Sequence, residues 1–276
     1  MALHLPINGV CNIKCVFCSA HGRTGGYELP DLLKEINDDR TGHVQISGGD
    51  PMMRRPLEVL AIVAHAKKQG KIVEFQTNGV LVEKWPPRRL SQLTGLIDFW
   101  NINFSAHTPE LDEAVTLTPG AFDARSRGVR RLLTLGKPVR LNYIVHEQNY
   151  RHAEDFVRFA AKAFPGFAWI QFSYVKGMGR AKGNAMVMPR FRDAAPFLTR
   201  AFRACDELGV NFDVDHIPVC FVLEWKDRHA DYRKMREAQP GRHLAEKQQV
   251  ADCDGCAMRE LCPGPRKDYI EVYGSL

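Results

Sequence analysis

Apolar and polar residues alternate in short runs along most of the chain, and each run is followed by a segment with helical spacing. The two-residue period is clearest in 138–145, where Val139, Leu141, Tyr143 and Val145 occupy every second position. Such a period predicts a strand with two different faces. Comparable runs rich in β-branched and aromatic residues occur at 4–8, 43–47, 71–77, 96–104, 169–175 and 210–214.

Amphipathic helices are expected between these strands. The i, i+3, i+4, i+7 spacing of one helix face occurs in Leu57, Leu60, Ala61 and Ala64, and again in Phe156, Phe159, Ala160 and Ala163. Strands that alternate with helices of this length predict an α/β fold with a parallel sheet. In either an open sheet or a partial barrel, a ligand site is expected at the carboxyl ends of the strands.

The alternation stops after about residue 215. The segment that follows is highly charged, poor in β-branched residues, and ends in cysteines. We therefore expect a main domain over 1–215 and a small extension over 216–276. Because so short an extension buries little core by itself, a metal is expected to hold it together.

Composition narrows the class of protein. The 276 residues are 45% hydrophobic, but they contain no apolar run of about 18 residues and no amino-terminal signal pattern. We expect a cytoplasmic protein that does not enter a membrane. The net charge is +6, and the basic runs 86–90 and 125–131 are expected on solvated helix faces, since no aromatic residues interleave with them as in single-strand binders. Nucleic acid is therefore a disfavoured partner.

Eight cysteines carry the strongest chemical information. Closely spaced thiols in a reducing compartment indicate metal ligation rather than disulfides. Cys11, Cys15 and Cys18 form C-x3-C-x2-C directly after the strand predicted at 4–8. A zinc ribbon pairs one C-x2-C with another. Three thiolates on one short loop instead suit a cubane iron–sulfur cluster with one iron that lacks a protein ligand.

With Phe17 before the last cysteine, this pattern resembles the radical S-adenosylmethionine (radical SAM) superfamily, whose signature is C-x3-C-x-(aromatic)-C. The resemblance implies a partial (β/α)6 TIM-like barrel and a [4Fe–4S] cluster on Cys11, Cys15 and Cys18. It implies that S-adenosylmethionine (SAM) chelates the open iron. One electron, from a donor such as a flavodoxin or ferredoxin, would then cleave SAM to a 5′-deoxyadenosyl radical.

Further motifs of the superfamily follow in order at the ends of the predicted strands. The stretch "SGGDP" at 47–51 resembles the GGE motif, with Asp50 in place of glutamate, and "QTNG", "FSAHT" and "YVKGMGRAKG" resemble later strand-end elements. By this resemblance the residues that contact SAM are Phe17, Gly48, Gly49, Asp50, Pro51, Asn78, Ser105, Asn142, Gly177 and Met178. Each short motif alone is an ordinary turn or loop pattern; their joint occurrence in order supports the resemblance.

The second cysteine group lies near the carboxyl end. Cys253, Cys256 and Cys262 form C-x2-C-x5-C, which resembles the SPASM and twitch extensions of radical SAM enzymes and implies one auxiliary [4Fe–4S] cluster. Cys220 either completes its ligand set or leaves one iron open, and His216 is a less favoured replacement. A zinc knuckle is the alternative. Cys205 lies on an apolar helical face with Leu198, Ala201, Phe202 and Leu208, and we expect it in the core.

These features favour an enzyme that abstracts hydrogen from a peptide or small-metabolite substrate, with an auxiliary cluster that assists electron transfer. Two alternatives are a zinc-binding protein that contacts nucleic acid and an iron–sulfur electron carrier without SAM chemistry. Only ten residues precede Cys11, which disfavours a leader-peptide-binding maturase. His107, after the fourth strand, either faces the substrate or is an ordinary loop histidine. Neither the substrate nor the oligomeric state follows from the sequence.

Overall fold

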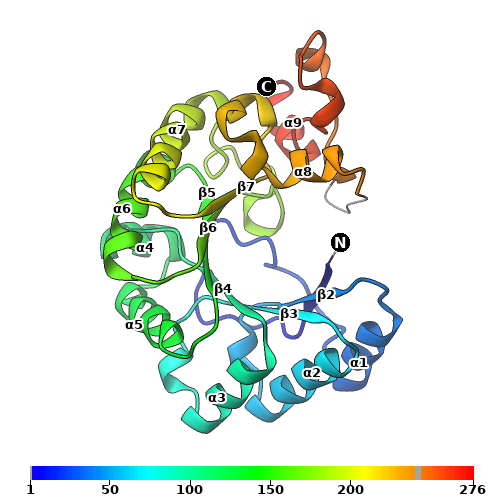
Figure 1. The fold of residues 1–276 in the computed structure, drawn as a ribbon, viewed down its shortest axis with the longest axis vertical. Coiled ribbons are helices and arrows are strands. Elements are labelled where there is room, and N and C mark those ends of the chain that lie inside the picture. The colour runs from blue at the N-terminus through cyan, green and yellow to red at the C-terminus, as the bar shows by residue number, and fades with distance from the viewer. Residues whose placement is uncertain (1, 240–243) are drawn as a thin grey trace.

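The computed structural model describes residues 2–239 and 244–276. Within them, seven parallel strands form one sheet in sequential order, β1-β2-β3-β4-β5-β6-β7. Figure 1 shows this sheet curving into an incomplete ring with the helices outside it. The expected partial barrel is therefore confirmed, with a seventh strand beyond the (β/α)6 unit. The strands are β1 (Leu3–Pro6), β2 (His43–Ser47), β3 (Ile72–Thr77), β4 (Phe99–Asn103), β5 (Val139–Val145), β6 (Trp169–Tyr174) and β7 (Phe212–Asp215).

Helices connect successive strands, as right-handed crossovers in a parallel sheet require. Those of the barrel are α1 (Leu29–Asp38), α2 (Pro56–Lys68), α3 (Pro87–Leu96), α4 (Pro109–Thr116), α5 (Ala121–Leu133), α6 (Ala153–Ala163) and α7 (Phe191–Glu207), and the C-terminal segment adds α8 (Ala230–Arg236) and α9 (Lys267–Tyr273). The first four each have proline in the first turn, where the missing N–H costs no hydrogen bond. Among the described helices, none is both long and apolar enough to cross a membrane.

Short 3₁₀ helices lie in several of the connecting loops. They are η1 (Pro51–Met53), η2 (Val82–Lys84), η3 (Tyr150–His152), η4 (Gly179–Ala181), η5 (Val219–Phe221), η6 (Leu223–Arg228), η8 (Ala251–Cys253) and η9 (Arg259–Leu261). Three of them, η1, η3 and η4, follow β2, β5 and β6 directly. They therefore shape the loops at the carboxyl end of the barrel, where a site is expected.

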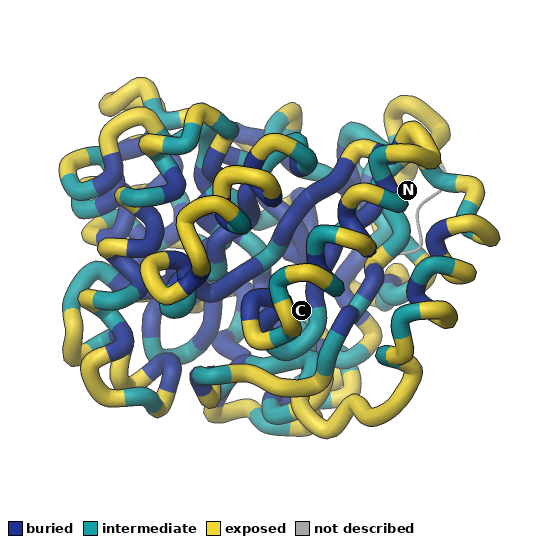
Figure 2. The backbone as a smooth tube through the Cα atoms, turned by 90° about the horizontal axis from the view of Figure 1, so that it is seen from below, coloured by how far each residue is buried: buried dark blue, intermediate teal, exposed yellow. Residues whose placement is uncertain are grey.

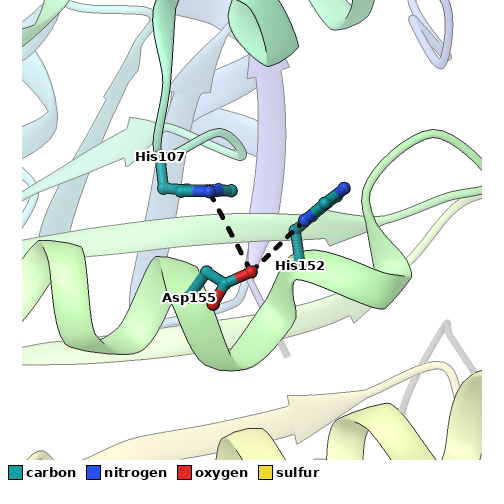
Figure 3. Close-up of side chains that lie close together, drawn as sticks. All are labelled: His107, His152 and Asp155. Atoms are coloured by element: carbon teal, nitrogen blue, oxygen red, sulfur yellow. Dashed lines mark hydrogen bonds and ion pairs between the residues drawn. The ribbon is translucent and has the colours of Figure 1, made fainter.

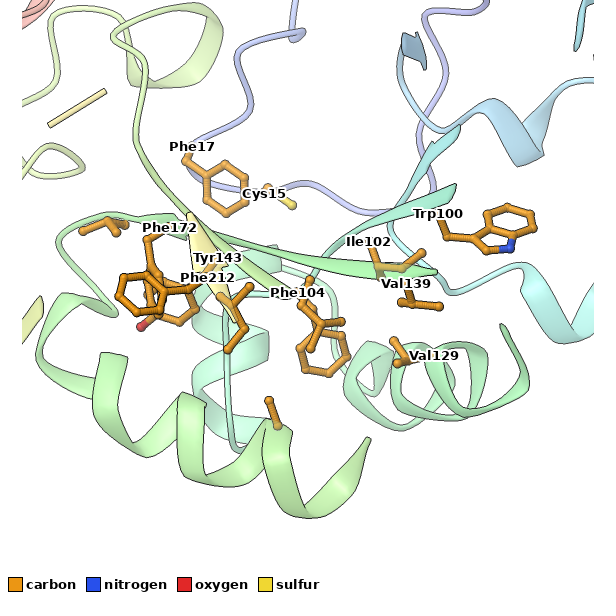
Figure 4. Packing of buried hydrophobic residues seen from close by; sticks show 14 of the residues in the cluster. Cys15, Phe17, Trp100, Ile102, Phe104, Val129, Val139, Tyr143, Phe172 and Phe212 are labelled. Carbon is orange, nitrogen blue, oxygen red and sulfur yellow. The ribbon is translucent and has the colours of Figure 1, made fainter. Parts of the chain in front are cut away.

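The main core lies between the sheet and the ring of helices. In β5 the residues Val139, Leu141, Tyr143 and Val145 are fully buried toward the helices, and the alternate positions face the barrel interior. Figure 2 shows buried backbone, in dark blue, running through the interior, with the exposed stretches, in yellow, on the outside. Figure 4 shows how aromatic side chains from neighbouring strands, among them Tyr143, pack together in this core.

The helix predicted around residues 57–64 is present as α2, but the prediction of which face is buried is wrong. Leu57 is 62% exposed, and the core-facing residues are Val59, Ile62, Val63 and Ala66. Both sets follow the spacing of one helix face. The observed set includes three β-branched aliphatic side chains where the predicted one has two alanines, so it removes more apolar surface from water.

The C-terminal segment, orange to red in Figure 1, packs beside the end of β7. Its own buried cluster is small and consists of Val219, Tyr232 and Cys262. In contrast, Tyr269 of α9 is fully buried in the main core, with its ring 3.9 Å from that of Phe191 in α7. The C-terminal segment is thus anchored to the barrel by aromatic packing.

Candidate functional site

A cavity of about 1080 Å³ occupies the barrel interior and reaches the loops at the carboxyl ends of the strands. Many of the predicted site residues line it. They are Cys11, Cys15, Cys18, Phe17, Gly48, Gly49, Pro51, Asn78, Asn142 and Met178. Residues far apart in the sequence therefore meet at one place, where the barrel topology predicts a site.

The cysteine loop that follows β1 is held by backbone hydrogen bonds from two sides. The amides of Lys14 and Val16 donate to the carbonyl oxygens of Thr116 and Val115, at the end of α4, at 2.9 Å each. On the other side, the carbonyl oxygen of Cys18 accepts from the amide of Arg180, at 3.0 Å. These contacts fix the loop between the segments that follow β4 and β6.

The three thiols differ in exposure although they line the same cavity. Cys11 is exposed, Cys18 is intermediate and Cys15 is buried. Burial raises the pKa of Cys15 to about 12, against the opposing effect of the nearby Arg125 guanidinium, and burial also raises the pKa of Cys11. These two free thiols are protonated at neutral pH, so metal binding would release their protons.

Phe17, the aromatic residue of the cysteine motif, is part of the buried core. Its side chain is buried and its ring centroid lies 5.1 Å from that of His146, just after β5. Figure 4 shows Phe17 beside Cys15. The aromatic residue therefore packs the cysteine loop onto the end of the sheet.

The two glycines after β2 permit a close approach of the cysteine loop itself. A Cβ on Gly49 would overlap the carbonyl oxygen of Val10, and one on Gly48 would overlap that of Asn8. The amides of Gly49 and Asp50 donate to the carbonyl oxygens of Asn8 and Val10, at 2.9 and 2.8 Å. Gly48 also has φ +136°, which other residues rarely adopt. Both glycines are therefore required by the packing of the protein itself, whether or not a ligand binds.

Asp50 is fully buried, and its carboxylate is used within the protein. It accepts from the amide of Met52 (2.9 Å), the hydroxyl of Thr77 (2.9 Å) and the amide of Asn78 (2.8 Å). Burial raises the pKa of this carboxyl despite these donors. Asp50 therefore joins the loops after β2 and β3. Asn78, which it positions, directs its side-chain amide toward the Cys11 sulfur at 3.6 Å.

Ser105 follows the end of β4, and Asn142 lies in the middle of β5 beside that end, in different surroundings. Ser105 is fully buried, and its hydroxyl accepts from the amide of Ile144 at 2.9 Å. It therefore ties the two strands together. Asn142 lines the cavity, and its buried Oδ1 has no hydrogen-bond partner among the described residues.

The glycine-bearing segment after β6 contacts both the cysteine loop and the C-terminal helix. The amide of Gly177 donates to Asp268 of α9 at 2.8 Å, and Met178 lines the cavity with its side chain 37% exposed. A Cβ on Gly179 would overlap the carbonyl oxygen of Cys18. This segment therefore connects the barrel to both the cysteine loop and the C-terminal helix α9.

Arg125 corrects the prediction that the basic run 125–131 is solvated. Its side chain is fully buried, where it forms an ion pair with Asp112 and donates to the carbonyl oxygens of Asn78 (3.2 Å) and Asn103. Arg127, in the same run, is exposed as expected. The burial of Arg125 follows from partners on α4 and two strand ends, which supply the oxygens that its guanidinium needs.

The barrel interior is polar, a feature that the sequence-based prediction missed. Cavity-lining side chains alternate with core residues along the strands: Gln45, Gln76, Asn101, Asn103, Arg140, Gln171 and Ser173. The fully buried Glu74 accepts from several of them. Although burial alone raises its pKa, hydrogen bonding from His43 and the positive charge of Arg140 hold the pKa of Glu74 at about 2. The same two-residue period that predicts β5 could have identified these inward positions.

The four cysteines of the extension lie near one another. Burial raises the pKa of Cys220 to about 11, and the neighbouring thiols of Cys262, Cys256 and Cys253 add to that rise. Cys262 is buried, and Cys253 and Cys256 are intermediate. The chain therefore brings Cys220 to the other three, across more than thirty residues of sequence.

The remaining candidates are placed elsewhere. His216 is fully buried at the end of β7, where it lines the barrel cavity 3.3 Å from Asp215. Cys205 is fully buried in α7 as predicted, although Leu208 of its proposed face is 42% exposed. His107 lies in the loop after β4, with His152 and Asp155 close to it.

Comparisons with known proteins agree with this geometry. A family model described as the Radical SAM superfamily matches residues 5–160. The probable GTP 3′,8-cyclase of Methanococcus aeolicus is 26% identical over 171 residues, covering 58% of this chain and 56% of that protein. The Fe-coproporphyrin III synthase of Methanosarcina barkeri is 24% identical over 244 residues, covering 84% and 58%. The chain thus spans just over half the length of these relatives.

A solved structure shows the same fold. The structure of native anSMEcpe with bound AdoMet and Kp18Cys peptide superposes with a TM-score of 0.69, at 14% identity, over 99% of this chain and 94% of that one. This likeness supports the fold alone. The family model, however, matches 156 of the 276 residues, from β1 through the cysteine loop to α6. The chain belongs to the Radical SAM superfamily.

Proposed function

We propose that this enzyme binds a [4Fe–4S] cluster through Cys11, Cys15 and Cys18, cleaves SAM reductively, and abstracts hydrogen from a peptide or small-molecule substrate. One observation carries the proposal. The three thiols line the same cavity as the glycine motif after β2, Asn78 after β3 and Asn142 of β5.

The residues present fit the implied cofactors. Three thiols on one loop match a cluster with one open iron. Asn142 lines the cavity, and its buried Oδ1 has no hydrogen-bond partner among the described residues, which is costly unless a ligand supplies one. A hydrogen-bond donor from a bound ligand, such as a ribose hydroxyl of SAM, would satisfy it. This cavity is at the upper end of the size of small-molecule sites, so it has room for SAM and a substrate.

When bound, the cluster and SAM supply a 5′-deoxyadenosyl radical, and the protein's own residues orient and enclose them. In this proposal Gly48, Gly49 and Pro51 form the backbone wall at the methionyl end of SAM. Asn78 donates toward the cysteine ligand that it already contacts. Asp50 acts through the loop that it holds rather than by direct contact, because its carboxylate is occupied by three donors within the chain.

The other SAM contacts come from the later strands. Asn142 offers its amide to the ribose or carboxylate, and Gly177 and Met178 line the adenine. Ser105 positions this wall, because its hydroxyl accepts a hydrogen bond from the backbone amide of Ile144 in β5.

Segment 216–276 forms the second part of the proposal, a SPASM/twitch-like extension with an auxiliary [4Fe–4S] cluster on Cys220, Cys253, Cys256 and Cys262. Four neighbouring thiols match four irons and leave no iron open, which suits electron transfer. Tetrahedral zinc needs thiolates about 3.8 Å apart, from Zn–S bonds of about 2.3 Å. Among the described residues, the cysteine sulfurs form no group of three within 4.8 Å of one another, which favours the larger cluster.

The substrate class follows from the lining of the barrel. Inward amide, hydroxyl and guanidinium groups favour a polar substrate that hydrogen-bonds inside the barrel. The peptide bound to anSMEcpe and the nucleotide and porphyrin in the names of the two relatives agree with a peptide or small metabolite. A flavodoxin or ferredoxin in the cytoplasm, where thiols stay reduced, is the proposed electron donor.

Formation of 5′-deoxyadenosine tests this function. The anaerobically reconstituted protein is reduced with dithionite in the presence of SAM, and the product is quantified by mass spectrometry. The wild type and the control Cys205→Ala, whose thiol lies in the α7 core, are expected to form it, and Cys15→Ala is not. Product from Cys15→Ala, or none from a reduced wild type, would contradict the proposal. Retained iron without product would favour the electron carrier, and zinc without iron would favour the zinc-binding protein.

A further inference from the structure

Two histidines and one aspartate meet at the rim of the barrel, outside the set of residues that lines the cavity. His107 comes from the loop after β4, His152 ends η3, and Asp155 lies in the first turn of α6. One ligand atom from each residue lies within 4.8 Å of the other two. Figure 3 shows the two imidazole rings and the carboxylate pointing toward one another.

The spacing of these three groups suits a small divalent ion. The Asp155 Oδ2 lies 3.3 Å from His152 Nδ1 and 4.0 Å from His107 Nε2. Metal–nitrogen and metal–oxygen bonds of about 2.0–2.1 Å in a tetrahedron place ligand atoms about 3.3–3.4 Å apart. One pair already has this separation. The pair of Asp155 and His107 reaches it by a shift of roughly 0.6 Å, which the Asp155 side chain, 57% exposed, has freedom to make. The third pair, between the two imidazoles, lies within 4.8 Å.

The backbone brings the ligands together before any ion binds. β4 and β5 are parallel neighbours, so the loops after them start side by side. The buried Asn149 joins these loops, because its Nδ2 donates to the carbonyl oxygens of Ser105 (3.0 Å) and Ile144 (2.8 Å). His107 and His152 therefore lie with ring centroids 5.3 Å apart as a result of the fold.

The state of His107 also suits a metal ligand. Its Nε2 is the nitrogen that lies toward Asp155, and its Nδ1 is buried without a hydrogen-bond partner among the described residues. Burial lowers the pKa of this imidazole, against the opposing effect of the negative charge of Asp155. Neutral imidazole is the form that binds metals.

We propose that His107, His152 and Asp155 form a binding site for a divalent first-row transition ion such as Zn²⁺. Two imidazoles and one carboxylate are the ligand set of many open metal sites, with the remaining positions held by water. The ion would clamp the loop after β4 to the start of α6. It would thereby stiffen the loop after β4, which carries Ser105.

Cobalt(II) is the probe that tests this site. The full-length protein is reconstituted with its iron–sulfur clusters, treated with a mild chelator, desalted, and titrated anaerobically with Co²⁺. Ligation by nitrogen and oxygen gives weak visible bands, whereas thiolate ligation adds a strong charge-transfer band, so binding to cysteines is recognised separately. The matched variants are His152→Ala, at a ligand, and His65→Ala, at a surface histidine of α2 that hydrogen-bonds Asn37.

The wild type and His65→Ala are expected to bind one equivalent of Co²⁺ at this site without the thiolate band, and Co²⁺ should raise their unfolding temperature. His152→Ala should bind it at least about 100-fold more weakly, because loss of an outer partner alone costs 10–100-fold. Equal Co²⁺ binding by the wild type and His152→Ala, or uptake by the wild type that does not saturate, would overturn the site and leave an ordinary histidine–aspartate ion pair. Either result leaves the proposed SAM chemistry untouched, because the site shares no ligand with the clusters.

Discussion

The buried ion pair behind the cysteine loop supports the sharpest stability prediction. Replacing Arg125 by methionine keeps much of the side chain's length but removes the guanidinium. Asp112 then stays fully buried without its partner, and the carbonyl oxygens of Asn78 and Asn103 each lose a donor. Breaking a buried ion pair by removing one partner costs about 3–5 kcal/mol, because an uncompensated charge remains in the core.

Urea denaturation of the apoprotein measures the change in the free energy of unfolding. The matched control is Arg127→Met, two residues along α5, whose ion pair with Glu83 is solvent-exposed on both sides and is worth less than about 1 kcal/mol. A second variant, Arg125→Met with Asp112→Leu, removes both charges and should recover most of the lost stability. A loss in Arg125→Met no larger than in Arg127→Met would refute this reasoning, as would a double variant less stable than the single one.

Three further predictions concern Gly49 of the glycine motif, the buried Glu74 in the barrel interior, and Cys220 of the C-terminal extension. Gly49→Ala places a methyl group into a carbonyl oxygen of the cysteine loop and should destabilise the protein by at least about 1–3 kcal/mol in urea denaturation, whereas Gly95→Ala, in open space on α3, should stabilise it slightly. Because the pKa of Glu74 is about 2 when folded and 4.5 as its ordinary value, the carboxylate stabilises the fold fully above pH 4.5 and loses this effect as the pH falls toward 2. The stability advantage of wild type over Glu74→Gln, roughly 3 kcal/mol at most, should therefore shrink over that window, and a pH-independent difference would contradict it. Cys220→Ala should lower iron from about eight toward four per chain, since two cubanes hold four irons each, while Cys205→Ala should retain it; full iron in Cys220→Ala would show that the auxiliary cluster does not need Cys220.

The strands could be predicted closely because their signal is local. β2 has the predicted bounds, and most other strand ends agree within two residues; β4 begins at Phe99, three residues late, because α3 and its turn occupy the start of the predicted run. Parallel pairing and the location of the site then follow from topology. Period and order along the chain thus determine the barrel almost without tertiary information.

Side-chain environments that depend on distant partners were harder to predict. The burial of Arg125 requires Asp112, which α4 contributes from a separate segment. Which face of α2 is buried depends on the side-chain volumes of two sets of residues that share the same helical spacing. Asp50 matched a motif position, yet its carboxylate is used by the chain's own donors, which no spacing rule reveals.

Some residues of the candidate site could likewise be predicted from local sequence, and others could not. The thiols, the glycines and Asn142 could be placed at one cavity from motifs at strand ends. The polar inward residues of β4, β5 and β6 were within reach of the same rule, because they are the other half of the alternation that predicts the strands. The approach of Cys220 to the other cysteines, in contrast, needs the fold of the whole extension and is not encoded in local spacing.

The most direct test of the central claim is whether SAM binds the cluster held by Cys11, Cys15 and Cys18. The reduced Cys256→Ala variant, in which the proposed auxiliary cluster is impaired, is studied by electron paramagnetic resonance and nuclear double resonance, with SAM labelled at its amine nitrogen. The account predicts that SAM changes the cluster signal and that the labelled nitrogen couples to it, and that neither effect occurs in Cys15→Ala. A signal that SAM leaves unchanged in Cys256→Ala, or the same nitrogen coupling in Cys15→Ala, would contradict it.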